Sequence, residues 1–293
     1  MTQNTVRSVA FLGAGLMGSP MIHRLLGAGI RVKAWNRTPV KLQGLARAGA
    51  IIAPTPAAAA EDVDAVCLCL ASVGAAESVL FGKDGVAGGA AKPQLVIDFS
   101  TVGPPHTLEF AARMRQLCGS AWMDAPVSGG VPGATQGKLV IFCGGNAADV
   151  ERLQPVFAAL AQRVTHAGGV GAGQTMKLCN QLIVSSNFVA IAEAIALARA
   201  GGIDAKLLPQ ALAGGFADSI PLQVFGGRMA SGITTPILGA IALMLKDAGA
   251  IGELAESQKQ ALPLAAATLA VYQQAAAQGL ANQDLSALMA LYP

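Results

Sequence analysis

Short runs of apolar residues, separated by longer stretches with helical periodicity, fill the first half of the chain. The runs lie at 8–13, 31–36, 64–70, 95–100, 122–127, 139–145 and 163–168. Several are apolar throughout, as parallel strands are when helices cover both faces of their sheet. The segments between them are long enough for crossover helices. This pattern predicts an α/β fold with a doubly wound parallel sheet.

The second half of the chain has a different pattern, because the strand-like runs stop after about residue 170. Residues 173–200 read as one long helix that ends at the Gly201-Gly202 pair. At 1.5 Å per residue this helix is about 42 Å long, enough to connect two domains. The remainder reads as helices separated by Gly and Pro. We therefore expect an α/β domain over residues 1–167 and an all-helical domain over residues 168–293.

The first apolar run ends in a glycine-rich turn, Gly13-x-Gly15-x-x-Gly18, directly before a helical segment. The first glycine permits a tight turn, the second lets the backbone approach a pyrophosphate, and the third lets the helix pack closely on the strand. The helix N-terminus attracts the phosphates. The N-terminal domain is therefore predicted to be a Rossmann domain that binds a dinucleotide. Its expected cofactor contacts are Gly13, Ala14, Gly15, Leu16, Met17, Gly18 and, at the end of the third run, Leu70.

The end of the second run bears on the choice between NAD and NADP. NAD sites place an Asp or Glu there to bind the ribose 2′-hydroxyl, whereas this chain has Asn36, Arg37 and Thr38. Arg37 can clamp a 2′-phosphate bidentately, and Thr38 can donate a hydrogen bond to it. We expect these three residues to bind NADP. The alternative is that Arg37 is a solvated turn residue and that Asn36–Thr38 cap the next helix.

Composition limits the kinds of partner. Charged residues make up only 13% of the chain, against about 25% in an average globular protein, which favours a homodimer or homotetramer that hides surface. The net charge of +3, with 4% aromatic residues and no dense Lys/Arg cluster, argues against nucleic acid and suits a small anionic substrate. The charge-free stretch 260–283 is broken by Gln, Pro and Gly, so we expect no membrane span.

The five cysteines, at 67, 69, 118, 143 and 179, form no C-x-x-C pair. Neither a disulfide framework nor a zinc site is indicated, and reduced thiols favour a cytoplasmic protein. No His/Cys/carboxylate cluster suggests a catalytic metal, so we expect none.

Lys177, in the stretch GAGQTMKLCNQ, is the only charged residue between Val164 and Ala192. A buried lysine without a partner is costly, so either Lys177 reaches water or an anionic group meets it. A lysine beside a carbonyl can stabilise the developing alkoxide and donate a proton to it. The alternative is a lysine whose stem packs along an apolar helix while its charge reaches solvent.

Two further stretches follow predicted strands. DFSTVGP (98–104) closes the fourth run, where open α/β sheets place their ligand crevice. DAPVSGG (124–130) follows the fifth, with Ser128 beside Gly129 and Gly130. Such a turn can direct a hydroxyl and consecutive backbone N–H groups at one carboxylate, or it can be a tight loop.

Together these stretches resemble the β-hydroxyacid dehydrogenase family over nearly the whole chain. The family's nucleotide motif is matched by FLGAGLMGSPM (11–21), with Ala14 where leucine is usual. Its C-terminal motif, near K-D-L-G-x-A-x-D, is approximated by KDAGAIGE (246–253), and its catalytic motif G-x-x-x-K by Gly173 and Lys177. Its substrate motif D-x-x-x-S-G-G-x-x-x-A is met by Asp124, Ser128, Gly129, Gly130 and Ala134.

The resemblance implies roles for individual residues. Lys177 would be the general acid in carbonyl reduction and the base in the reverse oxidation, while Ser128, Gly129 and Gly130 would hold the substrate carboxylate. Thr101 would lie near both nicotinamide and substrate. Lys246, oriented by Asp247, would approach the cofactor.

One position departs from the family pattern. Many members carry an asparagine four residues after the lysine, often preceded by another at three; here those positions are Gln181 and Asn180. Both lie on the helix face of Lys177. We favour Asn180 as the amide that contacts substrate, with Gln181 able to share or replace that role.

The expected function is NADP(H)-dependent interconversion of a small 3-hydroxy acid with its 3-oxo acid or semialdehyde. Reduction of 2-hydroxy-3-oxopropionate (tartronate semialdehyde) is favoured, with 3-hydroxyisobutyrate or a β-hydroxy amino acid such as serine or threonine as alternatives. A non-catalytic NADPH-sensing protein is a rival, but it would have no need of Lys177, Ser128 or Asn180. Within residues 214–229, Arg228 or Asp218 either discriminates between substrates or is a surface residue.

Overall fold

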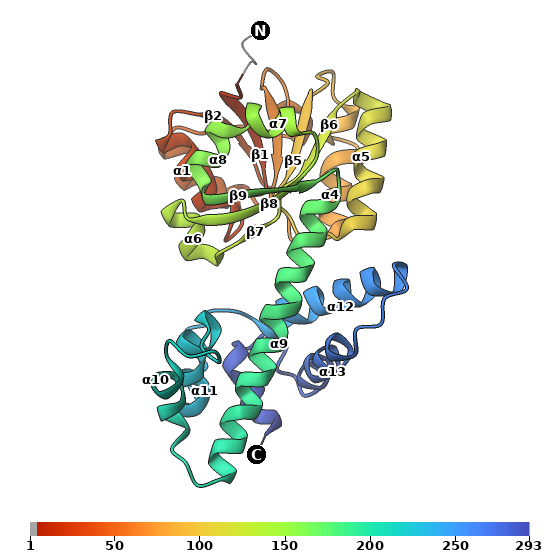
Figure 1. Cartoon of the computed structure of the whole chain (residues 1–293). Coiled ribbons are helices and arrows are strands. Elements are labelled where there is room, and N and C mark those ends of the chain that lie inside the picture. Colours follow the sequence, from red (N-terminus) through yellow and green to blue (C-terminus); the bar gives the residue numbers. More distant parts are fainter. Residues whose placement is uncertain (1–4, 293) are drawn as a thin grey trace. The chain divides into compact units, whose positions relative to one another are not determined.

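The structure is a computed structural model that describes residues 5–292 (Figure 1). It divides into two compact units, Met1–Lys177 and Leu178–Pro293, which we call the N-terminal and C-terminal units. The division falls inside a single long helix, α9 (Ala172–Ala200). Residues 167 and 168, where the sequence-based domain limit was placed, are the last residues of the preceding strand.

The N-terminal unit contains one sheet with the strand order β3-β2-β1-β4-β5-β6-β8-β7, and β9 pairs with β8. The strands β3 to β6 are parallel along this order, as predicted for a doubly wound sheet. The bounds are β1 Ser8–Leu12, β2 Arg31–Trp35, β3 Ile51–Ile52, β4 Ala65–Leu68, β5 Leu95–Asp98, β6 Ala121–Asp124, β7 Val127–Ser128, β8 Leu139–Gly144 and β9 Ala161–Gly168.

One edge of the sheet departs from the predicted parallel arrangement. Strand β8 runs antiparallel to β6 and β7, because residues 129–138 are too few for a full crossover connection. Strands β3 and β7 were not predicted, since two residues are too short to show a hydrophobic period.

Helices cover the sheet and make up most of the C-terminal unit. In the N-terminal unit they are α1 Gly18–Gly27, α2 Gln43–Arg47, α3 Pro56–Ala59, α4 Val73–Phe81, α5 Pro104–Cys118, α6 Gly130–Gln136, α7 Ala147–Arg152 and α8 Gln154–Leu160. From α9 onward they are α10 Leu208–Leu212, α11 Gly227–Ser231, α12 Ile241–Ser257 and α13 Pro263–Ala277. Shorter 3₁₀ or π-helical segments are Pro39–Leu42, Val86–Gly88, Ala205–Leu207, Leu222–Gly226 and Leu285–Leu291.

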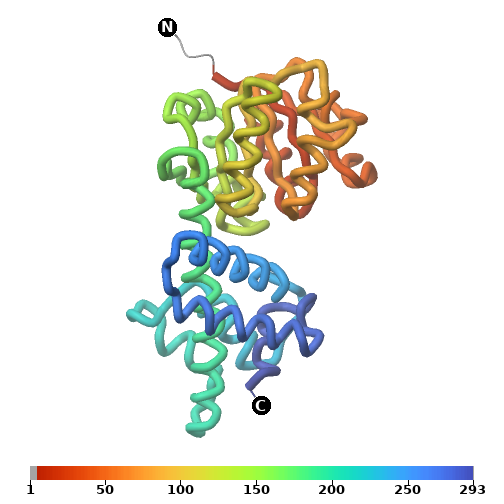
Figure 2. The backbone as a smooth tube through the Cα atoms, turned by 90° about the vertical axis from the view of Figure 1, so that its right-hand side faces the viewer, coloured from red at the N-terminus to blue at the C-terminus, as the bar shows by residue number. Residues whose placement is uncertain are grey.

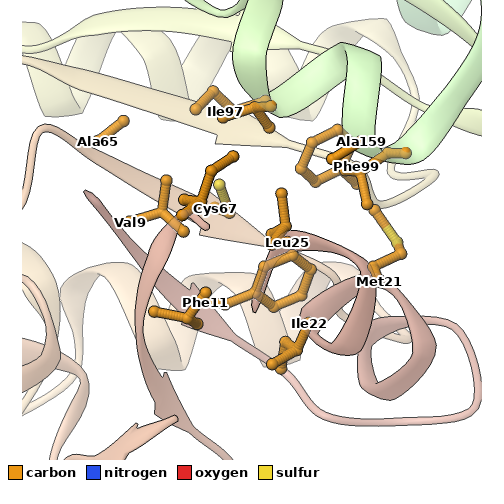
Figure 3. Close-up of a cluster of buried hydrophobic side chains, with 14 of the residues drawn as sticks. Val9, Phe11, Met21, Ile22, Leu25, Ala65, Cys67, Ile97, Phe99 and Ala159 are labelled. Atoms are coloured by element: carbon orange, nitrogen blue, oxygen red, sulfur yellow. The ribbon is translucent and has the colours of Figure 1, made fainter. Parts of the chain in front are cut away.

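Burial on both faces of the sheet explains why its strands are apolar throughout. In β1, Val9 and Phe11 pack into one core while Ala10 and Leu12 pack into another on the opposite face. Figure 3 shows the first core, where Phe11 and side chains of α1 such as Leu25 lie together. Since successive side chains of a strand point to opposite faces, a strand with two such cores has no exposed face for polar residues.

The C-terminal unit has a separate core around α9. Phe188 of α9 meets Phe225 edge-on, with ring centroids 4.9 Å apart, and Tyr272 of α13 is fully buried and donates a hydrogen bond to the Ser185 carbonyl. Helices α12 and α13 run side by side (Figure 2). By length and composition α9 could also cross a membrane, as many long core helices could. Its buried residues Phe188 and Ile195 belong to the protein core.

Candidate functional site

The predicted nucleotide and substrate residues of the N-terminal unit gather at one edge of the sheet. Strands β1, β4, β5 and β6 are parallel, so their carboxyl ends lie together. Gly13, Leu70 and Thr101 follow the first three of these strands, and Asp124 ends the fourth. The strand order reverses between β1 and β4, which is where open α/β sheets bind their ligands.

The glycine-rich turn has room for a phosphate at one glycine and none at the other two. A Cβ on Gly13 would overlap the Cys69 carbonyl oxygen, and one on Gly18 would overlap the carbonyl oxygen of Gly13. A Cβ on Gly15, by contrast, would have nothing within 4 Å. The first and third glycines are therefore needed for packing, and the second leaves the open backbone that a pyrophosphate requires. The turn fits a dinucleotide.

Asn36 holds the glycine-rich turn against the end of β2. Its Oδ1 accepts a hydrogen bond from the Ala14 N–H at 3.0 Å, and its Nδ2 donates to the Thr38 carbonyl at 3.0 Å. The amide thus uses its acceptor and one donor hydrogen within the protein. Asn36 shapes the turn at which a cofactor would bind.

Arg37 and Thr38 are exposed. Thr38 precedes the 3₁₀ helix Pro39–Leu42, but its side chain makes no capping hydrogen bond. Within residues 5–292 no hydrogen bond or ion pair is made by the side chain of Arg37. A hollow of about 480 Å³ lies beside Arg37, lined in part by Trp35 and Leu42. Both polar side chains can therefore turn toward a ligand.

The loop after β5 is joined to the loop after β4. The Leu70 N–H donates to Ser100 Oγ at 2.9 Å, and the Ser100 N–H donates to Asp98 Oδ1 at 2.9 Å. Thr101, the next residue, is half-buried. Two predicted ligand-binding loops are therefore fixed to each other by a serine that sequence reasoning did not single out.

Asp124 anchors the start of α9. Its Oδ1 accepts the Gly171 N–H at 2.7 Å and its Oδ2 accepts the Gln174 N–H at 2.8 Å. These are groups at a helix N-terminus that have no partner within the helix. Burial raises the pKa of the Asp124 carboxyl, while the backbone N–H groups of Gly171 and Gln174 oppose the rise. The first residue of the family's substrate motif thus sets the position of the helix that carries Lys177.

Gly173 lets α9 approach the sheet at this anchor. A Cβ at this position would lie 2.5 Å from the Phe142 carbonyl oxygen of β8 and 2.9 Å from Asp124 Oδ2. Gly144 of β8 is equally restricted, since its Cβ would lie 2.7 Å from the Gly173 nitrogen. The glycine of the G-x-x-x-K motif is therefore required by close packing of helix against strand.

Lys177, one turn after Gln174, is 7% exposed. Asn180 and Gln181 follow at the i+3 and i+4 positions of the same helix and so share its face. Asn180 Nδ2 donates to Gln181 Oε1 at 2.8 Å, and Gln181 Nε2 donates to Asp247 Oδ2 at 2.5 Å. Both ends of the Gln181 amide are thus engaged inside the C-terminal unit.

Ser128 ends β7, where it pairs with Val140 of β8, and it is half-buried. Gly129 and Gly130 are exposed and have φ angles of 122° and 60°, which side-chain-bearing residues rarely adopt. In the described part of the chain no protein acceptor takes the N–H groups of these two glycines. Two donors and a hydroxyl are therefore adjacent and accessible.

The remaining predicted residues lie in the C-terminal unit. Lys246 is exposed on α12 and precedes the buried Asp247. The alternative that Arg228 or Asp218 discriminates between substrates has less support. Arg228 donates to the Pro236 carbonyl and pairs with Asp284 at 3.4 Å, and Asp218 accepts hydrogen bonds from the Gly214 N–H and from Gln223.

Sequence reasoning missed Gln174, which is fully buried. Its Nε2 donates to the Ser100 carbonyl at 2.8 Å, and its Oε1 accepts the Val102 N–H at 3.3 Å. The one available signal was a polar, uncharged side chain in an apolar stretch, one turn before the lysine. Residues 5–292 contain no group of three or more His, Cys, Asp or Glu side chains that could hold a metal ion.

Comparison with known proteins divides the chain just after β9, before α9 begins. A family model described as the NAD binding domain of 6-phosphogluconate dehydrogenase matches residues 8–169. A second, described as the NAD-binding of NADP-dependent 3-hydroxyisobutyrate dehydrogenase, matches residues 171–292. The 2-hydroxy-3-oxopropionate reductase of Escherichia coli (strain K12) is 36% identical over 281 residues, which cover 96% of this chain and 95% of that protein.

The chain belongs to the β-hydroxyacid dehydrogenase family.

Other relatives agree with this membership. The NAD-dependent L-serine dehydrogenase of Pseudomonas aeruginosa is 32% identical over 304 residues, covering 98% of each chain. A crystal structure of 3-hydroxyisobutyrate dehydrogenase from Salmonella typhimurium has a TM-score of 0.86 at 29% identity, covering 97% of this chain and 99% of that chain. The predicted family is confirmed, as is the α/β fold with a Rossmann domain followed by a helical domain. The protein is accordingly an oxidoreductase of this family with a nicotinamide-dinucleotide-binding domain.

Proposed function

We propose that the protein is an NADP(H)-dependent enzyme that interconverts a small 3-hydroxy acid with its 3-oxo acid or semialdehyde. We propose 2-hydroxy-3-oxopropionate as the substrate to test first, because the reductase of that name is 36% identical along almost the whole chain. The single observation that carries the proposal is the position of Lys177. It lies one turn into a helix anchored by Asp124 at the ligand-binding edge of the sheet.

The residues of this chain have distinct tasks in the proposed reaction. Gly13–Gly18 would hold the pyrophosphate, and Arg37 with Thr38 would hold the 2′-phosphate. When bound, the nicotinamide supplies a hydride to the carbonyl carbon or accepts one from the carbinol. Ser128 and the N–H groups of Gly129 and Gly130 would hold the substrate carboxylate, which orients the reacting carbon.

Lys177 would move the proton. In reduction its Nζ ammonium stabilises the charge that develops on the carbonyl oxygen and then donates a proton to it. In oxidation the neutral amine accepts the hydroxyl proton. We propose Asn180 as the amide that contacts the substrate oxygen. Gln181 is better suited to orient Asn180, since both ends of its amide are already engaged.

NADP is proposed over NAD on the basis of Arg37. Relatives of both kinds exist, because one matching family model describes an NADP-dependent enzyme and one relative is named as NAD-dependent. The 2′-phosphate of NADP needs a cation and no neighbouring acid. Arg37 supplies that cation at the end of β2, followed by the hydroxyl of Thr38.

The proposed enzyme would work as a homodimer or homotetramer. Large apolar side chains of the C-terminal unit are exposed in a single chain, among them Ile183 at 70% and Leu197 at 75% on α9. Exposed apolar side chains of this size favour association. Light scattering coupled to gel filtration measures the mass in solution, and a mass of one chain at micromolar concentration would contradict this assembly.

The deciding experiment combines a substrate panel with one substitution. Nicotinamide absorbance would be followed with 2-hydroxy-3-oxopropionate, 3-hydroxyisobutyrate, serine and threonine, each with both cofactors in the matching direction. Lys177→Ala should lower kcat by about 10²–10⁴-fold, the usual contribution of a general acid or base, while NADPH still binds. A variant within severalfold of wild type, or a wild type inert toward the whole panel, would refute the proposal.

A further inference from the structure

Three side chains, Ser100, Gln174 and Asp124, connect the loops of the N-terminal unit to the start of α9. Leu70 N–H donates to Ser100 Oγ, Gln174 Nε2 donates to the Ser100 carbonyl, and the Gln174 N–H donates to Asp124 Oδ2. These bonds join the ends of β4, β5 and β6 to one turn of one helix. Each of the three side chains is buried, so water does not compete for these contacts.

The Gln174 side-chain amide makes hydrogen bonds to the backbone on both sides of Thr101. It donates to the carbonyl of the residue before Thr101 and accepts the N–H of the residue after it, at 2.8 and 3.3 Å. A neighbouring β-strand would offer the same donor and acceptor pair to an extended segment. The loop after β5 has no such strand at this point, and the glutamine side chain takes its place. The backbone at Thr101 is thereby fixed from both sides.

We infer that Gln174 is a positioning residue that sets Thr101 and Lys177 relative to each other. Its side chain fixes the loop that carries Thr101, and its backbone belongs to the helical turn immediately before Lys177. A shift of either element by about 1 Å would misplace the proton donor, and a misplacement of this size can cost about 10²-fold in rate. The inference rests on the proposed function, because it assigns the reaction to these two residues.

The side chain needed here must be a neutral donor and acceptor at once. Leucine offers neither group, and an ionised glutamate offers acceptors only, one of which would face the Ser100 carbonyl. A protonated glutamic acid, however, has one O–H donor and one carbonyl acceptor in nearly the glutamine shape. Burial favours that protonated form. The glutamate variant can therefore regain the function of the amide when it is protonated.

The first test compares Gln174→Leu, Gln174→Glu and wild type for kcat and for NADPH affinity. In Gln174→Leu we expect kcat to fall about 10–10²-fold, with the Kd for NADPH within about threefold, since the glycine-rich turn is untouched. In Gln174→Glu the ratio of its kcat to that of wild type should rise as the pH falls from about 8.5 to 5.5. Met176→Leu, at an exposed position on the same turn, is the matched control and should match wild type.

The second test does not depend on turnover. Amide hydrogen exchange in Gln174→Leu should be faster at Val102, which loses its acceptor, and unchanged at Phe99, whose N–H is held by the Leu68 carbonyl. If the wild type turns over none of the substrates in the panel, the proposed function fails. Hydrogen exchange still tests whether the Gln174 side chain fixes the backbone on both sides of Thr101. The inference is overturned by unchanged exchange at Val102 or by wild-type kcat in a folded Gln174→Leu. If that variant does not fold, a Gln174→Glu that shows no recovery at low pH overturns it.

Discussion

The side-chain amide of Gln181 on α9 donates a 2.5 Å hydrogen bond to the buried carboxylate of Asp247 on α12. Gln181 Oε1 also accepts a hydrogen bond from Asn180 Nδ2. Gln181, which stands where many family members carry an asparagine, thus connects two helices of the C-terminal unit. This arrangement supports the proposal that Asn180, and not Gln181, contacts the substrate.

Gln181→Leu removes this connection at nearly constant volume. Hydrogen bonds to charged groups contribute about 1.5–3 kcal/mol, so the free energy of unfolding should fall by that amount. Circular dichroism in urea would follow the helices of the C-terminal unit, while both tryptophans, Trp35 and Trp122, report on the N-terminal unit. Cys179→Ser, at an exposed site on the same helix, should change stability by less than about 0.5 kcal/mol. An equal effect of the two substitutions would contradict this prediction.

Arg37→Ala should reduce the preference for NADPH. A charge-assisted contact of about 1.5–3 kcal/mol corresponds to a loss of about 10–10²-fold in kcat/KM with NADPH, and kcat/KM with NADH should change little. Arg47 is also an exposed arginine, and it lies on α2. Arg47→Ala is therefore the matched control for the loss of one positive charge. A wild type that uses NADH as well as NADPH would rule out NADP selection by Arg37.

Gly173→Ala should destabilise the N-terminal unit, because the new Cβ would be 2.5 Å from the Phe142 carbonyl oxygen and close to Asp124. Overpacking of this kind costs about 1–3 kcal/mol, and kcat should fall as the start of α9 shifts. Gly252→Ala on α12 is the matched control, since its Cβ would have nothing within 4 Å. It should gain about 0.5–1 kcal/mol from helix propensity. Urea denaturation of the two variants should therefore give shifts of opposite sign.

Asp284→Asn should lower stability in a pH-dependent way. Burial raises the pKa of Asp284, but hydrogen bonds from the Leu238 N–H, from Ser286 and from the Gly239 N–H outweigh it, so the pKa lies below the ordinary 3.8. A carboxyl whose pKa is lower in the folded state than in the unfolded state stabilises the fold at pH values above its unfolded pKa. This stabilisation is lost as the pH falls through its folded pKa. At neutral pH we expect the free energy of unfolding of wild type to exceed that of the variant by about 1.5–3 kcal/mol.

The difference between wild type and Asp284→Asn should shrink only below about pH 4, as the Asp284 carboxyl becomes protonated. Thermal unfolding from pH 7 down to about pH 3 measures it. A difference that stays constant across this range would show that Asp284 acts through its shape and not through its charge.

The sequence by itself determined the features that depend on local pattern. The apolar runs of β1, β4 and β5 predicted strands buried on both faces, and the spacing Gly13-x-Gly15-x-x-Gly18 predicted the dinucleotide turn. The isolated charge of Lys177 in an apolar helix drew attention to that position. Each of these signals lies within a few residues, where backbone geometry and burial act directly on residue choice.

Only the tertiary structure decided the features that depend on distant partners. Gln174 meets the Ser100 carbonyl 74 residues away, and Asp124 caps a helix that begins about 50 residues later. Asn36 holds Ala14, 22 residues before it, and β8 reverses direction because its connection is too short for a crossover. A hydrogen bond across such separations leaves no periodic signal, since one glutamine or aspartate in an apolar stretch has the same composition whatever it contacts. The sequence predicted a role for Lys177, and the packing of α9 against the sheet determined which contacts hold the helix that carries it.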